Sequence, residues 1–442
     1  NRIPCFMPGQ KSSRYPNAPV GLIFGGDPGC PAGSGYDASP GKFAPRAGFA
    51  YRIGQKTVIR GGAGIYYTVP PTTTFNGTAA TAPFSPRFLL TRVRFEDPFG
   101  SASIANPFPA QFGGGSVPGS EAQFTLPVQV NRSLVRDYER TTLGTWSLRL
   151  ERQVGANWLL SAAYLGNGGY HILGGRELNP ARYIPGASTV GNTQSRRPVQ
   201  ALSTVNGLKT DFNSHYHSLQ LNAEKRFSAG LSVLANYSWS KTIDNNGRTN
   251  PDNRGFDYGL SNDHIPHIFH LTTIWAIPTP RLQGFAGKAL EGWELTSLTT
   301  WQSGFPFSVA SGLDNAFTGT GGQRADFIGT DLDQVKLSGQ SHAQQIQRFF
   351  NTSLFVPNAI GTFGNSGRNI LSGPRLFNTD LGLIKDTNVT ERVKVQFRAE
   401  FFNVFNSVNF NGPGATVGTP GFGRITSARD PRIIQLTLKL IF

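Results

Sequence analysis

The stretch that decides the fold is Ile433–Phe442, which reads IIQLTLKLIF. Side chains alternate between the two faces of a β-strand, so Leu438, Leu440 and Phe442 share one face. The polar residues of the stretch, which fall on the opposite face, are Gln435, Thr437 and Lys439. This alternation predicts a strand that separates an apolar from an aqueous environment.

The same alternation recurs along the chain and is clearest in 393–401, where Val, Phe and Ala alternate with Lys, Gln, Arg and Glu. We predict about eleven strands of about ten residues, the length that crosses a bilayer at a tilt. The predicted strands are 43–53, 57–67, 146–151, 158–170, 218–224, 231–240, 267–277, 293–303, 376–386, 393–401 and 433–442.

The connections between these strands alternate between short and long. Tight turns are predicted at 54–56, 155–157, 228–230 and 386–391, and a medium-length link at 278–292. The long connections are rich in Gly, Pro and Asn, and they are 68–139, 172–213, 243–264, 304–375 and 406–431. A soluble β-sandwich has no reason to separate loop lengths in this way, and structureless loops this long count against a compact soluble domain.

In a meander barrel, short turns lie on the periplasmic side of the membrane and long loops on the outside. The loop lengths therefore predict an all-β fold, a transmembrane antiparallel meander β-barrel with long external loops, in the outer membrane. Leu438, Leu440 and Phe442 then form the C-terminal signal of the barrel. Short helices are predicted within two links, at 284–290 and 343–350.

Composition agrees with a barrel and argues against other classes. The hydrophobic content is 38%, and no apolar run reaches the roughly 18 residues of a transmembrane helix. The net charge is +15, but Lys and Arg are scattered with no run of five, so we expect no nucleic-acid partner. We expect contacts with outer-membrane lipid and anionic lipopolysaccharide instead.

Cys5 and Cys30 lie in one loop-like stretch of the sequence. Either a disulfide between them or two free thiols agrees with the sequence.

Five segments together resemble one family. They are Phe43–Tyr51, Lys56–Gly62, Tyr237–Lys241, Gln302–Phe307 and Phe397–Asn406. These segments look like the C-terminal barrel half of TonB-dependent outer-membrane receptors, and most of all the Oar-like group common in acidobacteria. The resemblance implies energised uptake of a large ligand, a plug domain of the same full-length protein as partner, and the TonB complex as a partner reached through a missing N-terminal part.

The resemblance also implies a longer protein. The family's barrel has about 22 strands, with a plug and often an N-terminal β-sandwich ahead of it. We expect 1–442 to be the C-terminal portion of one barrel domain, with the plug and the β-sandwich absent. The chain starts at Asn1 without a signal-peptide pattern, which we take to reflect processing or truncation.

The polar faces of the predicted strands supply the candidate functional residues. If the apolar partners face lipid, these charged side chains point into the barrel, where a plug or a solvated lumen would meet them. They are Arg149, Glu151, Glu224, Lys394, Arg398 and Glu400. Aromatic residues near strand ends predict interfacial girdles, with a soluble core as the alternative, and they are Trp146, Trp158, Tyr237, Trp239, Trp275 and Trp293.

Catalytic and metal-binding patterns are weak. Neither a G-x-S-x-G nor a P-loop frame occurs, so we predict no enzyme, no catalytic residue and no bound cofactor.

The histidines do not predict a metal site. His267 and His270 fall on opposite faces of a strand, and no third ligand accompanies His215 and His217. The oxygen-rich loop 244–255 does not fit an EF-hand, and calcium there stays an alternative to ordinary turn chemistry.

Three functions follow in order of preference. The first is a TonB-dependent transporter barrel. The second is a surface-exposed structural or adhesion barrel without transport. The third is a secreted soluble all-β glycan-binding protein, which would need no detergent.

Overall fold

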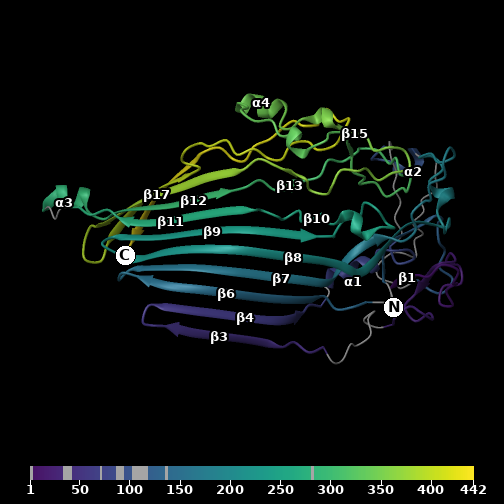
Figure 1. Cartoon of the computed structure of the whole chain (residues 1–442), viewed down its shortest axis with the longest axis horizontal. Coiled ribbons are helices and arrows are strands. Elements are labelled where there is room, and N and C mark those ends of the chain that lie inside the picture. The colour runs from purple at the N-terminus through teal and green to yellow at the C-terminus, as the bar shows by residue number, and fades with distance from the viewer. Residues whose placement is uncertain are drawn as a thin grey trace.

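The computed structural model describes residues 3–32, 42–69, 72–85, 94–101, 118–134, 138–279 and 283–442. Its main feature is one antiparallel meander in which every long strand pairs with the next long strand along the chain (Figure 1). The strands are β3 (Arg46–Ile53), β4 (Thr57–Tyr67), β6 (Thr142–Val154), β7 (Trp158–Glu177), β8 (Leu202–Ser228), β9 (Leu231–Asp244), β11 (His267–Ala276), β12 (Trp293–Gln302), β17 (Leu376–Asn388), β18 (Lys394–Phe402) and β19 (Ile433–Ile441). These strands confirm all the predicted ones, with ends that shift by a few residues and with β7 and β8 far longer than predicted.

The two ends of the meander differ, and we name them the turn end and the loop end. At the turn end, β3 and β4 are joined through Gly54, β6 and β7 through Gly155, and β8 and β9 through Ala229 and Gly230. All four of these residues have positive φ, which tight hairpin turns require. The link between β11 and β12 carries α3 (Gly284–Leu290), as predicted. The long connections all leave from the loop end (Figure 1).

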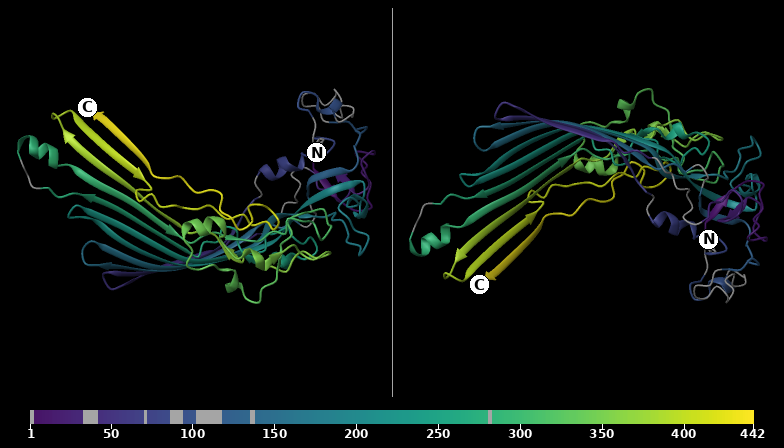
Figure 2. Two further views of the ribbon diagram at one scale, coloured as in Figure 1. Left: turned by 90° about the horizontal axis from the view of Figure 1, so that it is seen from above. Right: turned by 90° about the horizontal axis from the view of Figure 1, so that it is seen from below.

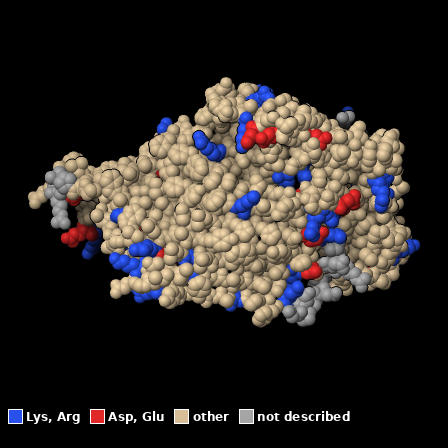
Figure 3. Space-filling model, viewed as in Figure 1, with Lys and Arg blue, Asp and Glu red and all other residues tan. Residues whose placement is uncertain are grey.

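The strand register gives the sheet two chemically different faces. Residues paired across neighbouring strands point to the same face, so Leu148, Tyr164, Leu219 and Trp239 form one continuous row over four strands. The same face includes Leu436 and its successive partners, which are Ala399, Leu383 and Leu295. We call this the apolar face. Figure 3 shows few Lys, Arg, Asp or Glu side chains over the strands on the side that it views.

The six tryptophans all fall on the apolar face by register, in two groups at opposite strand ends. Trp293 and Trp301 lie eight residues apart on β12. Trp239 lies eight residues from Leu231, the partner of Trp275, and Trp146 lies eight residues from Val154, the partner of Trp158. Eight residues span about 27 Å of strand at about 3.4 Å per residue. With the tilt of a barrel strand, this approaches the apolar band of about 25 Å between the aromatic girdles of outer-membrane barrels.

Two glycines of the strands let aromatic rings lie on the apolar face. A Cβ added at Gly61 would come within 2.4 Å of the Phe49 ring, and one at Gly166 within 2.3 Å of the Trp146 indole. Each ring therefore lies over the backbone of the neighbouring strand. Gly61 and Gly166 therefore leave room for the Phe49 and Trp146 rings, which a larger residue would displace.

The long connections are not the irregular loops that their composition predicted. β7 and β8 continue past the meander and are joined there by β5 (Val128–Leu134), β1 (Pro4–Phe6) and β2 (Leu22–Phe24). The side chains at the centre of this extension are fully buried, and they include Leu22, Phe24, Val130, Leu202 and Val205. The Gly and Pro content of these connections predicted irregular chain and so hid the strands. In addition, β1 and β5 are paired with segments distant in the sequence, which no local pattern indicates.

A second packed unit forms at the loop end above β12 and β17. Its apolar core comprises Val309, Ala325, Val335, Phe350, Phe355 and Leu371. The unit holds the short ladders β13 (Pro306–Phe307) with β16 (Leu371–Ser372) and β14 (Asp326–Phe327) with β15 (Phe355–Val356). It also carries the predicted helix, α4 (His342–Gln347). The remaining short elements are β10 (Gly259–Leu260), α1 (Thr72–Thr78), α2 (Pro98–Ser101) and 3-10 turns at Gln194–Arg196, Arg254–Asp257, Leu332–Val335 and Thr352–Leu354.

β3 and β19 are the two edges of the meander in the described part of the chain. Ten antiparallel steps separate them, so they run in the same direction. The views of Figure 2 show that the sheet between them is curved rather than flat. Among the described residues, no helix is long and apolar enough to cross a membrane.

The apolar face yields a direct test. Leu221 lies on this face midway between the two tryptophan levels, whereas its neighbour Gln220 lies on the opposite face. We expect Leu221→Arg to destabilise the barrel by about 2–4 kcal/mol, the cost of Arg at the lipid midplane. Gln220→Arg should have little effect. Urea unfolding in lipid vesicles measures both; equal effects of the two substitutions would contradict the assignment of the faces.

Candidate functional site

The polar face of the sheet gathers all six charged residues predicted from the sequence. In the strand register, Arg149 pairs with Ala163, and the row of paired residues continues through Gln220 and Ser238 to β11. Followed on through β12 and β17, the register places Arg398 on the same face as Arg149. The residues that share this face are Arg149, Glu151, Glu224, Lys394, Arg398 and Glu400.

Ion pairs and hydrogen bonds connect most of these side chains. Glu151 accepts from Arg149 at 2.9 Å and lies 3.4 Å from the Arg60 guanidinium. Arg149 also donates to Ser161 Oγ at 3.1 Å. Near the other edge of the meander, on the same face, Arg398 lies 3.3 Å from Glu400, and Lys394 pairs with Asp386. These pairs are partly exposed, so they make a hydrated charged surface rather than a strong source of stability.

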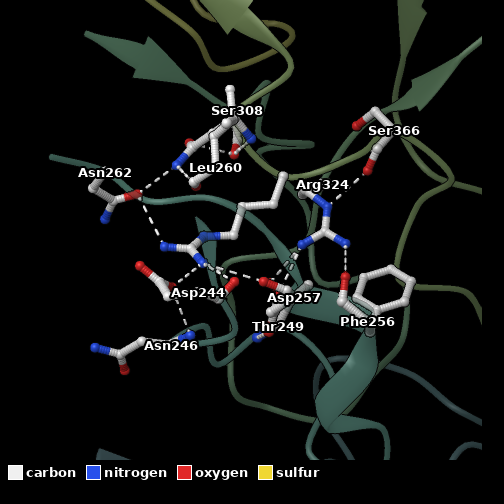
Figure 4. Close-up of polar contacts among 12 residues, drawn as sticks. Asp244, Asn246, Thr249, Phe256, Asp257, Leu260, Asn262, Ser308, Arg324 and Ser366 are labelled. Atoms are coloured by element: carbon white, nitrogen blue, oxygen red, sulfur yellow. Dashed lines mark hydrogen bonds and ion pairs between the residues drawn. The ribbon is translucent and has the colours of Figure 1, made fainter. Parts of the chain in front are cut away.

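The loop end holds a second candidate, a polar network that joins two of the long connections (Figure 4). Arg324 is buried and donates to Asp257 Oδ1 at 2.5 Å, to Phe256 O at 2.8 Å and to Ser366 O at 2.7 Å. Its guanidinium also lies 4.1 Å from the centre of the Phe256 ring. Burial lowers the pKa of Arg324, and the Asp257 carboxylate opposes this shift. Arg324 therefore fixes the connection after β9 to the connection after β12.

Arg368 makes a parallel link between the same two connections. Its guanidinium pairs with the Asp244 carboxylate and donates to Asp257 O at 3.2 Å. Next to it, Asn369 donates to Leu260 O at 2.7 Å and to Asn262 Oδ1 at 2.8 Å. Sequence reasoning missed both arginines, because the partners are separated by 67 and 124 residues and no local pattern connects them.

The network also bears on the calcium alternative for 244–255. Asp244 and Asp257 face guanidinium groups, which supply the positive charge that a cation would supply. No group of three or more His, Cys, Asp or Glu suited to a metal ion occurs in the described ranges.

The histidines face different surroundings. His267 lies on the apolar face and contacts the Tyr237 hydroxyl at 2.8 Å, while His270 lies on the polar face 3.1 Å from Thr300 Oγ1. His264 is buried and accepts from Thr242 N at 3.2 Å.

The N-terminal segment packs on the extension of β8 as a compact lobe. Cys5 and Cys30 form a disulfide in this lobe, with their Cα atoms 5.7 Å apart. Asp27 accepts from Ser12 Oγ at 2.6 Å and from Phe24 N at 2.8 Å. Burial raises the pKa of the Asp27 carboxyl, but the hydrogen bonds outweigh burial and hold its pKa below the usual value.

The comparison with protein families agrees with this geometry. The model described as "Outer membrane beta barrel domain" matches residues 1–435. The chain belongs to this family. Its place is the outer membrane, with the apolar face toward lipid, and the loop end of the barrel faces the outside because long loops of such barrels do so.

Solved structures similar to this barrel are outer-membrane transporters and receptors. They include the outer membrane transporter YddB from Escherichia coli (10% identity, TM-score 0.43, 88% of this chain and 39% of that chain). The FrpB iron transporter from Neisseria meningitidis is similar at 11% identity and TM-score 0.41, over 90% of this chain and 39% of that chain. The ferripyoverdine receptor of Pseudomonas aeruginosa is similar at 11% identity and TM-score 0.40, over 91% and 33%. This barrel chain thus spans less than half the length of these proteins. No curated protein matches it.

The buried Arg324–Asp257 pair predicts a local loss of stability. Arg324→Met leaves the Asp257 carboxylate buried and unpaired, which should destabilise the loop unit by about 3 kcal/mol. Hydrogen exchange of residues 245–262 should accelerate accordingly, and Arg324→Met with Asp257→Leu should recover much of the protection. Lys336→Met breaks an exposed pair with Asp333 and serves as the control. Equal acceleration in the control would contradict a special role for Arg324.

Asp27 predicts a pH dependence of the N-terminal lobe. Since the folded pKa lies below the unfolded value of about 3.9, its ionised form stabilises the lobe at all pH values above the unfolded pKa. This stability is lost as the pH falls through the lower, folded pKa. Asp27→Asn should remove it at neutral pH, seen as faster hydrogen exchange of 3–32 after correction for intrinsic rates. Asp252→Asn, in an exposed loop, should leave the exchange of 3–32 unchanged; a wild-type rate in Asp27→Asn would refute the prediction.

Proposed function

We propose that this chain is the C-terminal part of a TonB-dependent outer-membrane receptor of the Oar-like kind, which takes up a large ligand. The observation that carries the proposal is that β3 and β19, the two edges of the meander among the described residues, run in the same direction. An antiparallel barrel closes with an even number of strands as a rule, so these edges need at least one further strand between them. A longer chain that contributes the remaining strands of a barrel of about 22 supplies it.

The polar face fits a lumen filled by a plug domain. Its ion pairs are hydrated and partly exposed, which suits a surface that a plug contacts and leaves during transport. Arg149, Glu151, Glu224 and the Arg398–Glu400 pair are the plug contacts that we propose. The TonB complex would act on that plug from the periplasm, and the barrel itself needs no catalytic group and no bound cofactor.

The loop end fits a rigid surface that captures the ligand. Two buried arginine–aspartate pairs and two apolar cores hold the connections in fixed positions. A preorganised surface loses less conformational entropy when it binds. The same rigidity would also serve a structural or adhesion barrel, which is the second candidate. Membership of an outer-membrane family removes the soluble glycan-binding protein from consideration.

The test uses the natural full-length protein, purified in detergent, and the periplasmic domain of TonB from the same organism. We expect the two proteins to elute as one complex in size-exclusion chromatography. Deletion of the segment that precedes the plug should abolish the complex and leave the heat-modifiable gel mobility of a folded barrel. Failure of the intact receptor to bind TonB would refute the transport proposal and favour adhesion.

A further inference from the structure

A polar hollow lies at the loop end, where β7 and β8 continue past the meander. Its volume is about 430 Å³, within the range of about 300–1,000 Å³ that small-molecule sites occupy. Tyr170 in its wall lies four residues beyond Gly166, the partner of Trp146, and so about 14 Å farther out along β7. The hollow is therefore outside the apolar band. Its lining includes Glu139, Tyr170, His171, Lys209, Asp211 and Asn213.

Two β-bulges in the β7–β8 ladder shape this hollow. Tyr170 and His171 of β7 together lie opposite Asn213 of β8, and one step farther out the extra residue is on β8, within 210–211. His171 has a φ of +54°, which is uncommon for a residue other than glycine. Bulges redirect side chains from the regular alternation and are frequent beside active sites. Here they bring side chains of both strands into one hollow.

The two carboxylates of the hollow are already paired with cations. Glu139 lies 3.2 Å from the His171 ring. Asp211 lies 3.6 Å from the Arg176 guanidinium and 3.8 Å from that of Arg254. Neither carboxylate is therefore free to hold an ammonium group, but carboxylate oxygens with one partner still accept hydrogen bonds from hydroxyl groups.

Three other side chains of the hollow are available to a ligand. Within the ranges that the structure describes, the Lys209 ammonium and the Asn213 side-chain amide have no hydrogen bond or ion pair. The Tyr170 side chain is 45% exposed. With the histidine neutral, Lys209 leaves the hollow with one uncompensated positive charge. A ligand that uses all three groups has one negative charge, hydroxyl groups and a face of C–H groups.

We propose that this hollow binds a uronic acid, the carboxylated sugar unit of acidic polysaccharides. Lys209 pairs with the sugar carboxylate in a charge-assisted hydrogen bond. Asn213 and Glu139 bond to the sugar hydroxyls, and the C–H face of the sugar lies on the Tyr170 ring, whose face is electron-rich. A phosphate monoester would bring a charge of about −1.5 to −2, more than one free cation balances.

This site goes beyond the transport proposal, because binding of the sugar requires neither the plug nor the TonB complex. The hollow would attach an acidic polysaccharide to the external end of the barrel. Its ligand is recognised by one charge and by the shape of a sugar ring, so the two contributions are measured separately.

The test titrates the natural full-length protein in detergent with trigalacturonate by isothermal calorimetry. We expect Lys209→Gln to bind about tenfold more weakly, since it loses one hydrogen bond between charged groups. Lys209→Arg keeps the charge and should retain most of the affinity. The matched control is Lys241→Gln, which removes a cation of β9 near the same end and outside the lining of the hollow. Heat-modifiable gel mobility should be intact in every variant.

Two further probes identify the chemistry. The methyl ester of trigalacturonate has the same rings without the charge, and it should bind wild type as weakly as the acid binds Lys209→Gln. Triglutamate has carboxylates without sugar rings and should bind at least about tenfold more weakly than trigalacturonate. Equal affinity of wild type and Lys209→Gln for trigalacturonate, or no binding by wild type, would overturn the proposal. Tight binding of triglutamate would also overturn it and assign the hollow to acidic peptides.

Discussion

The structure depends on one constraint: in a membrane, backbone N–H and C=O groups must bond to one another, because lipid offers no partners. The meander from β3 to β19 meets this constraint strand by strand, and its register is shifted only in the β7–β8 pair near Ile172 and in the β8–β9 pair between Lys225 and Ser228. Register also decides which side chains face lipid. A shift of one residue in any pair would turn that strand's apolar side chains into the lumen. The unbroken apolar face over eleven strands is therefore the sign that the pairing is consistent throughout.

This constraint applies only within the membrane, and outside it other interactions stabilise the chain. Beyond the outer tryptophans the connections meet water, and their stability comes from burial and from paired charges. Phe24, Leu202 and their neighbours form one core, and Phe350 and Phe355 form another. Arg324 and Arg368 join connections that lie far apart in the sequence.

Much of the membrane part was readable from the sequence. The alternation in 393–401 and 433–442 predicted the strands and their faces, and the contrast between short and long links predicted which end carries the loops. Cys5 and Cys30 were recognised as a pair, but the sequence left disulfide and free thiols open. The loop end was read as irregular chain, because β1 and β2 have only three residues each and the alternation in β5 is limited to Val128–Val130. β5 pairs with residues of β8 that lie 74 or 75 positions away, and Cys5 of β1 pairs with Leu134 of β5, 129 positions away.

The sequence by itself determined the strands of the meander, since alternation with a period of two is a local property that each segment carries alone. The sequence also determined that six charged residues share the polar face, because the residues that alternate with the apolar ones must lie on the opposite face of each strand. Only the tertiary structure decided the loop-end units and the Arg324–Asp257 and Arg368–Asp244 pairs. Each of these requires two segments to meet, and the free energy of a buried ion pair or an apolar contact exists only after distant parts of the chain have been brought together.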